Sequence, residues 1–296
     1  MKRLSLVIAL ALALLLLAGC VDEIPEPVVS KAPVVTDAPP VQEAYPVSVD
    51  GETFDSAPAT VASLSPSITA ILYDIGAQES LVGVSDYCDW PPAVEGISRI
   101  GSPAKPDIDA LVALAPELLI TCSPIAATDI LMLEQVGTRV LKLSSPKSYA
   151  ELYDLYIKLS LIFNGTVNGI DIANAAMSPF DELMVTAQSM GISKTFVVVE
   201  NYAKGGLMLS PPDTFSSDIL SVFGENIWQG ESYTVTDDEL FEIGPDVVFY
   251  AAGLRESDIE KTFPYSQLIE IDFERFERPS VRVMEVVSDI INKIER

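Results

Sequence analysis

The sequence contains no histidine, which limits the chemistry that its other polar residues can perform. Ser-His-Asp and Cys-His nucleophilic catalysis, histidine-ligated zinc sites and the commonest proton shuttle at neutral pH are excluded. No nucleophile motif stands out among the remaining residues. We therefore expect a protein that binds its target rather than an enzyme, and one that needs no cofactor.

Arginines supply the first candidate binding group. Arg255, Arg275 and Arg278 are the densest basic group of the C-terminal half. A guanidinium binds carboxylate or catecholate oxygens with two parallel hydrogen bonds, so this group is a candidate anion site. The alternative is surface pairing with Glu274 and Glu277, worth under about 1 kcal/mol for each pair.

Aromatic residues supply the second candidate group. Tyr87 and Trp90 lie in an acidic loop, and each can lay a flat face against a macrocycle or an aromatic chelate. Trp90 precedes two prolines, so packing beneath the loop is its alternative role. Tyr202 lies in a glycine-rich, partly basic segment at 201–206, which we expect at the rim of a binding site.

Small polar residues occur where a strand-like run meets a helical pattern. Ser65 and Ser67 flank a proline, and such a turn presents hydroxyls and helix N–H groups to a ligand. Alternatively, Ser67 is only the N-cap, worth about 0.5 to 2 kcal/mol to the helix. Cys88 and Cys122 either pair, adding about 3 to 4 kcal/mol of stability, or remain separate buried thiols.

An internal repeat indicates the elements that position these residues. DALVALAPELLIT at 109–121 matches DELFEIGPDVVFY at 238–250, and each reads as helix, proline stop and buried strand. Strand-like runs at Val61–Leu64 and Phe196–Val199 open the two halves. This pattern predicts an α/β protein with two Rossmann-like lobes, at 59–165 and 191–296, and a ligand cleft between them.

A helical passage separates the two repeats. Ser148 and Glu151 fit a capping box, and the helix that they begin is expected to end at Asn164–Gly165. A second helix over 166–190 is the predicted connection between the lobes, with Pro179 as a kink or a break. The alternative is two ordinary helices that belong to one lobe.

The N-terminus has the features of a secreted, lipid-anchored protein. Residues 1–20 combine two basic residues, an apolar run and the string LAGC, which resembles a bacterial lipobox whose cysteine, Cys20, is lipidated. Acyl chains contribute about 0.8 kcal/mol per buried methylene, so two or more hold a protein at a membrane. An uncleaved anchor is the alternative. Residues 21–58 are rich in proline and acids, which predicts a disordered tether.

The net charge of −25 excludes some partners. Loss of Lys2 and Arg3 with the leader would bring it to about −27. The electrostatic field of this negative charge repels nucleic acid and anionic lipid headgroups, and it favours a partner with a basic docking face.

Several motifs, in order, resemble the cobalamin and ferric-siderophore binding proteins of ABC importers, whose two lobes are linked by a helix. The matching strings are SLSPS at 63–67, VGVSDY at 82–87, DWPP at 89–92, LVALAPELLI at 111–120 and FERFERPSVR at 273–282. The resemblance implies a monomeric receptor, lipid-anchored outside the cytoplasm. It would deliver an iron chelate (a siderophore or haem) or a corrinoid to an ABC permease and its ATPase.

The same resemblance assigns roles to residues. Tyr87, Arg275 and Phe276 match positions on or next to the ligand. Asp109 and Asp213 fall where the family carries permease-docking glutamates, although both also fit helix caps.

The sequence also departs from the cobalamin pattern. Pro103 and Cys122 stand where cobalamin-binding members have cleft tryptophans, which weakens the case for cobalamin itself. A chelatase-like enzyme on the same scaffold and a sensing lipoprotein remain the alternative functions.

Overall fold

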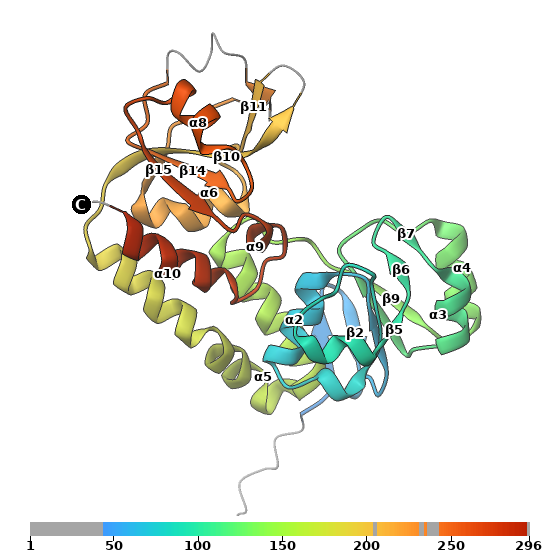
Figure 1. The fold of residues 1–296 in the computed structure, drawn as a ribbon. Helices are drawn as coiled ribbons and strands as arrows, with labels where there is room; N and C mark the ends of the chain where they lie inside the picture. Colours follow the sequence, from blue (N-terminus) through green and yellow to red (C-terminus); the bar gives the residue numbers. More distant parts are fainter. Residues whose placement is uncertain (1–43, 204–205, 231–233, 236–242, 295–296) are drawn as a thin grey trace, which may run out of the picture. The chain divides into compact units, whose positions relative to one another are not determined.

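The computed structural model describes residues 44–203, 206–230, 234–235 and 243–294, and its fold is two α/β lobes joined by helix α5 (Figure 1). The predicted fold class is confirmed. The N-terminal lobe has a parallel sheet in the order β5-β4-β3-β8-β9. Its elements are β3 (Val61–Ser63), α2 (Pro66–Asp74), β4 (Leu81–Val84), β5 (Ser98–Arg99), α3 (Ile108–Leu114), β8 (Leu118–Thr121), α4 (Ala127–Gln135) and β9 (Arg139–Lys142).

Alternate residues of the central strands are buried on opposite faces of this sheet. Val61 and Ile120 pack into the cluster that contains α2 and α5, whereas Ala62 and Leu119 pack against α3 and α4. Helices cover both faces, so the strands are apolar on both, and this is why each reads in the sequence as a continuous apolar run.

The C-terminal lobe repeats this plan with a mixed sheet in the order β13-β11-β10-β14-β15, and β12 also pairs with β10. Strands β12, β14 and β15 join it by parallel pairing, and β11 and β13 by antiparallel pairing. The elements are β10 (Lys194–Ala203), β11 (Gly206–Leu209), α6 (Phe215–Leu220), β12 (Gly224–Asn226), β13 (Thr234–Val235), β14 (Val247–Ala251), α8 (Glu256–Thr262), β15 (Gln267–Ile271), α9 (Glu274–Glu277) and α10 (Val283–Lys293).

The sequence repeat has a counterpart in hydrogen bonding. Glu117 donates its backbone N–H to the Thr60 hydroxyl at 3.0 Å, and Asp246 donates in the same way to the Thr195 hydroxyl at 3.0 Å. Each acid therefore fixes the start of its strand, β8 or β14, beside the first strand of its lobe. The helix expected ahead of β14 lies largely outside the described residues.

Helix α5 (Tyr149–Ser189) consists of two arms that meet at a turn. Ser148 caps the first arm by accepting from the Glu151 N–H at 3.1 Å, as expected from the capping box. Gly165 has a non-helical conformation, with φ 70° and ψ 179°, and separates the arms at the predicted place. Pro179, in contrast, lies within the second arm without breaking it.

The two arms of α5 run back against each other. The rings of Tyr149 and Phe180, one from each arm, meet edge to face with centroids 5.1 Å apart. A Cβ on Gly169 would lie 3.0 Å from the Leu161 Cα, so the arms approach closely beside the turn. The second arm then leads into β10, and α5 thereby joins the lobes.

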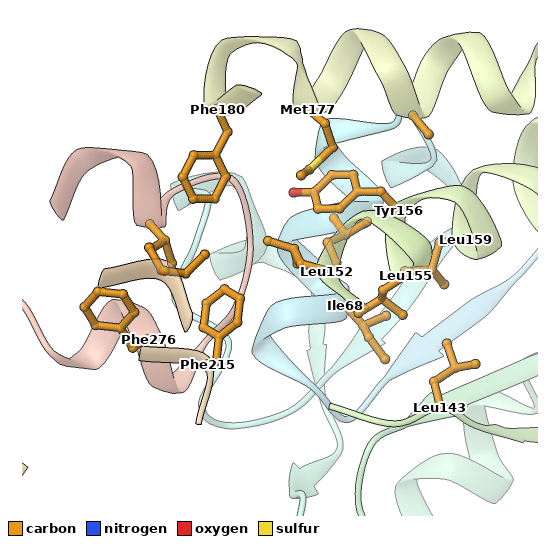
Figure 2. Packing of buried hydrophobic residues seen from close by; sticks show 14 of the residues in the cluster. Ile68, Leu143, Leu152, Leu155, Tyr156, Leu159, Met177, Phe180, Phe215 and Phe276 are labelled. Atoms are coloured by element: carbon orange, nitrogen blue, oxygen red, sulfur yellow. The ribbon is translucent and has the colours of Figure 1, made fainter. Parts of the chain in front are cut away.

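A single apolar core runs from one lobe through α5 into the other (Figure 2). Side chains of α5 lie between those of α2 and those of α6 and α9. The labelled members are Ile68, Leu143, Leu152, Leu155, Tyr156, Leu159, Met177, Phe180, Phe215 and Phe276. Movement of one lobe against the other must therefore act on this shared core.

The expectation of a tether through residue 58 is wrong for its last part. Strands β1 (Val47–Val49) and β2 (Glu52–Phe54) form an antiparallel hairpin, and Val47, Val49 and Phe54 are buried in the core. The hairpin turns at Asp50 and Gly51, both with positive φ. An Asp-Gly turn between alternating apolar residues is a strong hairpin signal, and the proline-rich surroundings obscured it.

The segment before this hairpin is built into the turn of α5. Ala44 accepts from the Thr166 N–H at 2.8 Å, and the Tyr45 hydroxyl donates to the Ile162 carbonyl at 2.9 Å. In a regular helix, that N–H and that carbonyl would bond to each other. Residues 44 and 45 therefore satisfy the two backbone groups that the turn at Gly165 separates.

No helix among the described residues has the length and apolarity needed to cross a membrane.

Candidate functional site

A cavity of about 240 Å³ lies where a loop of the N-terminal lobe meets the α9–α10 segment of the C-terminal lobe. The loop follows β4, and the segment follows β15, so both come from the carboxyl ends of strands, where ligands bind in open α/β sheets. The lining residues are Asp89, Trp90, Asp272, Glu274, Arg275, Arg278 and Arg282.

Backbone contacts fix the loop that carries Asp89 and Trp90. The Arg99 guanidinium donates to the carbonyls of Ser85 at 2.9 Å and of Cys88 at 2.6 Å. Asp89 and Trp90 follow directly, and Trp90 is 40% exposed. These two hydrogen bonds therefore fix the backbone of the loop that presents both side chains.

Arg278 connects the two lobes. Its Nη1 donates to Asp89 Oδ2 at 2.7 Å, and its Nη2 lies 2.6 Å from Glu274 Oε1. Burial tends to raise the pKa of Asp89, but the hydrogen bond and charge of Arg278 outweigh it and hold that pKa below its usual value. Asp89 is therefore an anion near neutral pH and forms a true ion pair across the cavity.

Arg275 and Arg282 each keep a buried N–H group without an acceptor. Arg275 pairs with Asp272 at 2.9 Å and Glu285 at 2.7 Å, but its Nη1 has no partner among the described residues. Arg282 stacks on Trp90, with Cζ 4.0 Å from the ring centroid, and its Nε likewise has no partner in the described chain. Burial, followed by the charge of Arg275, lowers the pKa of Arg282.

A hydrogen-bond relay centred on the buried Tyr156 reaches Val281, the residue before Arg282. The Tyr156 hydroxyl, on α5, donates to Asp74 Oδ2 at 2.5 Å and accepts from the Val281 N–H at 3.1 Å. Burial raises the pKa of Asp74, against the opposing effects of the Tyr156 hydrogen bond and the Arg282 charge. The relay joins α2, α5 and the segment before α10, so it connects both lobes next to the cavity.

Of the predicted ligand-binding residues, only Trp90 and Arg275 line this cavity. Phe276, adjacent to Arg275, is 4% exposed, and its ring packs on Phe215 with centroids 6.3 Å apart. The structure thus places Phe276 in the core and not on the cavity wall. Tyr87, in the same loop as Asp89 and Trp90, is 57% exposed but does not line the cavity.

The serine turn and Tyr202 are also absent from the cavity wall. Ser65 is the N-cap of α2 and accepts from the Ile68 N–H, so the alternative that Ser67 is only the N-cap is wrong. Ser67 is the second residue of the helix and is buried. Tyr202, near the end of β10, is 39% exposed. Ligand contact by these residues stays a prediction.

The arginine group differs from the one expected. Arg255 precedes α8 and pairs with Asp258 at 2.8 Å, and it does not line the cavity. Arg282 takes its place beside Arg275 and Arg278. Sequence reasoning missed Arg282 and Asp89. The spacing of Arg275, Arg278 and Arg282 by three and four residues was an available, weak signal.

The expected docking and lipidation residues have separate positions. Asp109 and Asp213 are exposed, and neither is a helix cap: Asp107 caps α3 and Thr214 caps α6. Asp213 lies 3.5 Å from Lys147. A docking role for both remains a prediction, while Cys20 lies outside the described residues.

The two other cysteines are free thiols, Cys88 buried and Cys122 partly buried. The structure therefore contains no disulfide between them.

Comparison with known proteins identifies the family. Residues 61–269 match the family described as periplasmic binding protein. The chain belongs to this family. A similar curated relative is the uncharacterized ABC transporter substrate-binding lipoprotein YvrC of Bacillus subtilis, 23% identical over 99% of this chain and 97% of the relative.

Solved structures of other binding proteins share the fold. The periplasmic vitamin B12 binding protein BtuF of Vibrio cholerae superposes with a TM-score of 0.64 at 19% identity, covering 80% of this chain and 96% of BtuF. The siderophore binding protein BauB, bound to ferric iron and two acinetobactin molecules, gives 0.66 at 17% identity, over 83% and 98% of the two chains.

Proposed function

We propose that this protein is the substrate-binding component of an ABC importer, and that it captures an iron chelate or a corrinoid between its lobes. The observation that carries the proposal is the cavity between the lobes, with Trp90 and Asp89 on one side and three arginines on the other. Membership of the periplasmic binding protein family supports the transport role.

The arrangement suits capture and release. The cavity wall is divided between lobes that share one core through α5, so a ligand bound to both sides would hold them together. Micromolar affinity requires about 8 kcal/mol, which one aromatic face and a few charge-assisted hydrogen bonds supply. This is a binding role, without a catalytic step.

The remaining parts of the proposal concern location and partners. Lipidation of Cys20 would anchor the chain on the extracytoplasmic face of the cell membrane, as the lipobox-like sequence suggests. Asp109 and Asp213, exposed on different lobes, would then meet basic residues of the permease, which with its ATPase takes up the ligand from a monomeric receptor.

A ligand panel tests the proposal. Purified protein is heated with ferric catecholate, ferric hydroxamate, haem or cyanocobalamin, and unfolding is followed by fluorescence or circular dichroism. A ligand at 100 times its Kd stabilises the folded state by about 2.7 kcal/mol, which raises the Tm of a chain of this size by roughly 5 to 10 °C. If none of the four raises the Tm, the proposed ligand class is wrong.

A further inference from the structure

We propose that the cavity selects ligands carrying a compact anionic group, and that Asp89 occupies the place of that group in the free protein. The anion would bind to Arg275 and Arg282, and it would displace Asp89 from Arg278. This inference rests on the proposed function and specifies the chemical class of the ligand.

The first support is the unequal pairing of the three arginines. Two of them, Arg275 and Arg278, are held by carboxylates of their own lobe. Arg282 has no ion pair within the described part of the chain, and its guanidinium stacks on the Trp90 ring. An arginine stacked in this way keeps its edge available for a planar oxyanion.

The second support is the pair of unsatisfied donors. Arg275 Nη1 and Arg282 Nε are both buried, and both belong to residues that line the same cavity. Both donors are already shielded from water in the free protein, so their cost is present before a ligand binds. Carboxylate or catecholate oxygens would relieve that cost once the cavity side chains adjust to admit them, whereas a neutral, apolar ligand would leave it unchanged. The donors therefore discriminate in favour of an anion.

The third support is that Asp89 belongs to the N-terminal lobe, opposite the arginines, and is exposed. It is the carboxylate of the cavity wall that comes from the N-terminal lobe, 189 residues away in sequence from its partner Arg278. Its side chain is 65% exposed. An exposed ion pair is weak, so Asp89 can turn into solvent when a stronger anion arrives.

The size of the cavity limits how much of a ligand enters. Its volume of about 240 Å³ is below the roughly 300 to 1,000 Å³ that is usual for sites enclosing a whole ligand. At this separation of the lobes it accommodates one compact group. The chain has a net charge of −25, so capture of an anion depends on this local group of arginines.

The test compares two probes that differ mainly in charge, an anionic ferric tris-catecholate and a neutral ferric trihydroxamate. Binding to the full-length protein is measured by quenching of tryptophan fluorescence. The Asp89→Asn variant should bind the catecholate about fivefold more tightly, because one exposed ion pair no longer competes. The Arg282→Gln variant should bind it at least tenfold more weakly. Hydroxamate affinity should change less than twofold in both.

Glu95→Gln is the matched control, because Glu95 is an exposed acid in the segment after the same loop and does not line the cavity. It removes the same charge and should leave catecholate affinity within twofold of the wild type. Thermal unfolding of each variant checks that the fold is retained. Equal affinity of the wild type for both probes, or an unchanged catecholate affinity in both cavity variants, overturns this inference and leaves the proposed function standing. Failure of the whole ligand panel overturns both.

Discussion

Replacing Gly165 with alanine tests how residues 44 and 45 are built into the turn of α5. The glycine has φ 70° and ψ 179°, a conformation that other residues adopt only at a cost of about 1 to 3 kcal/mol. A Cβ there would lie 2.6 Å from the Ala44 carbonyl oxygen. Ala44 must therefore move, and its bond to Thr166 and the neighbouring Tyr45 bond to Ile162 are lost at about 1 kcal/mol each.

The free energy of unfolding should fall by about 3 to 5 kcal/mol in this variant, measured by urea denaturation of the purified protein. Gly137→Ala is the control. Gly137 also has a positive φ, 88°, but nothing lies within 4 Å of its Cβ position. Its replacement should cost only about 1 to 2 kcal/mol, from backbone strain alone. Equal losses in the two variants would refute the role assigned to Ala44.

Three further predictions concern the Tyr156 relay and the β1–β2 hairpin. Tyr156→Phe leaves the Asp74 carboxyl and the Val281 N–H without their partner and should lower the free energy of unfolding by about 1 to 3 kcal/mol in urea titrations. Because the pKa of Asp74 is raised in the folded state, the stability it contributes is lost as pH rises from the usual value near 3.8 through the raised value. Asp74→Asn should remove this pH dependence. Denaturation of the wild type and the variant at several pH values measures it, and an equal change of the unfolding free energy with pH in both would contradict the prediction. Phe54→Ala should lower the free energy of unfolding by about 3 to 5 kcal/mol in the same assay, since Phe54 is 3% exposed. The same replacement in a disordered tether would leave the free energy of unfolding unchanged.

Much of the fold can be predicted, because short stretches of sequence determine its strands and the ends of its helices. The apolar runs at Val61–Leu64 and Phe196–Val199 mark the opening strands because helices cover both sheet faces. Gly165 was identified as the end of a helix because glycine tolerates a positive φ. Residues 47–54 are hard to recognise as strands because prolines at 46 and 58 stand on either side of them, although the Asp50-Gly51 turn is a readable signal.

The site was less accessible to sequence reasoning. Asp89 meets Arg278 across 189 positions of the chain, and no local pattern encodes that contact. Trp90 and Arg275 could be selected by chemical type and family resemblance. The burial of Phe276 depends on packing against Phe215 of another helix, a contact that the sequence around Phe276 does not show.

Hydrogen–deuterium exchange with and without ligand tests the central claim most directly. The ligand is the complex from the panel that raises the Tm most. If a ligand is held between the lobes at the arginine cavity, amides should be protected both in the loop at 85–91 and in the segment at 272–283, one from each lobe. Protection confined to one lobe, or lying away from both segments, would contradict this account.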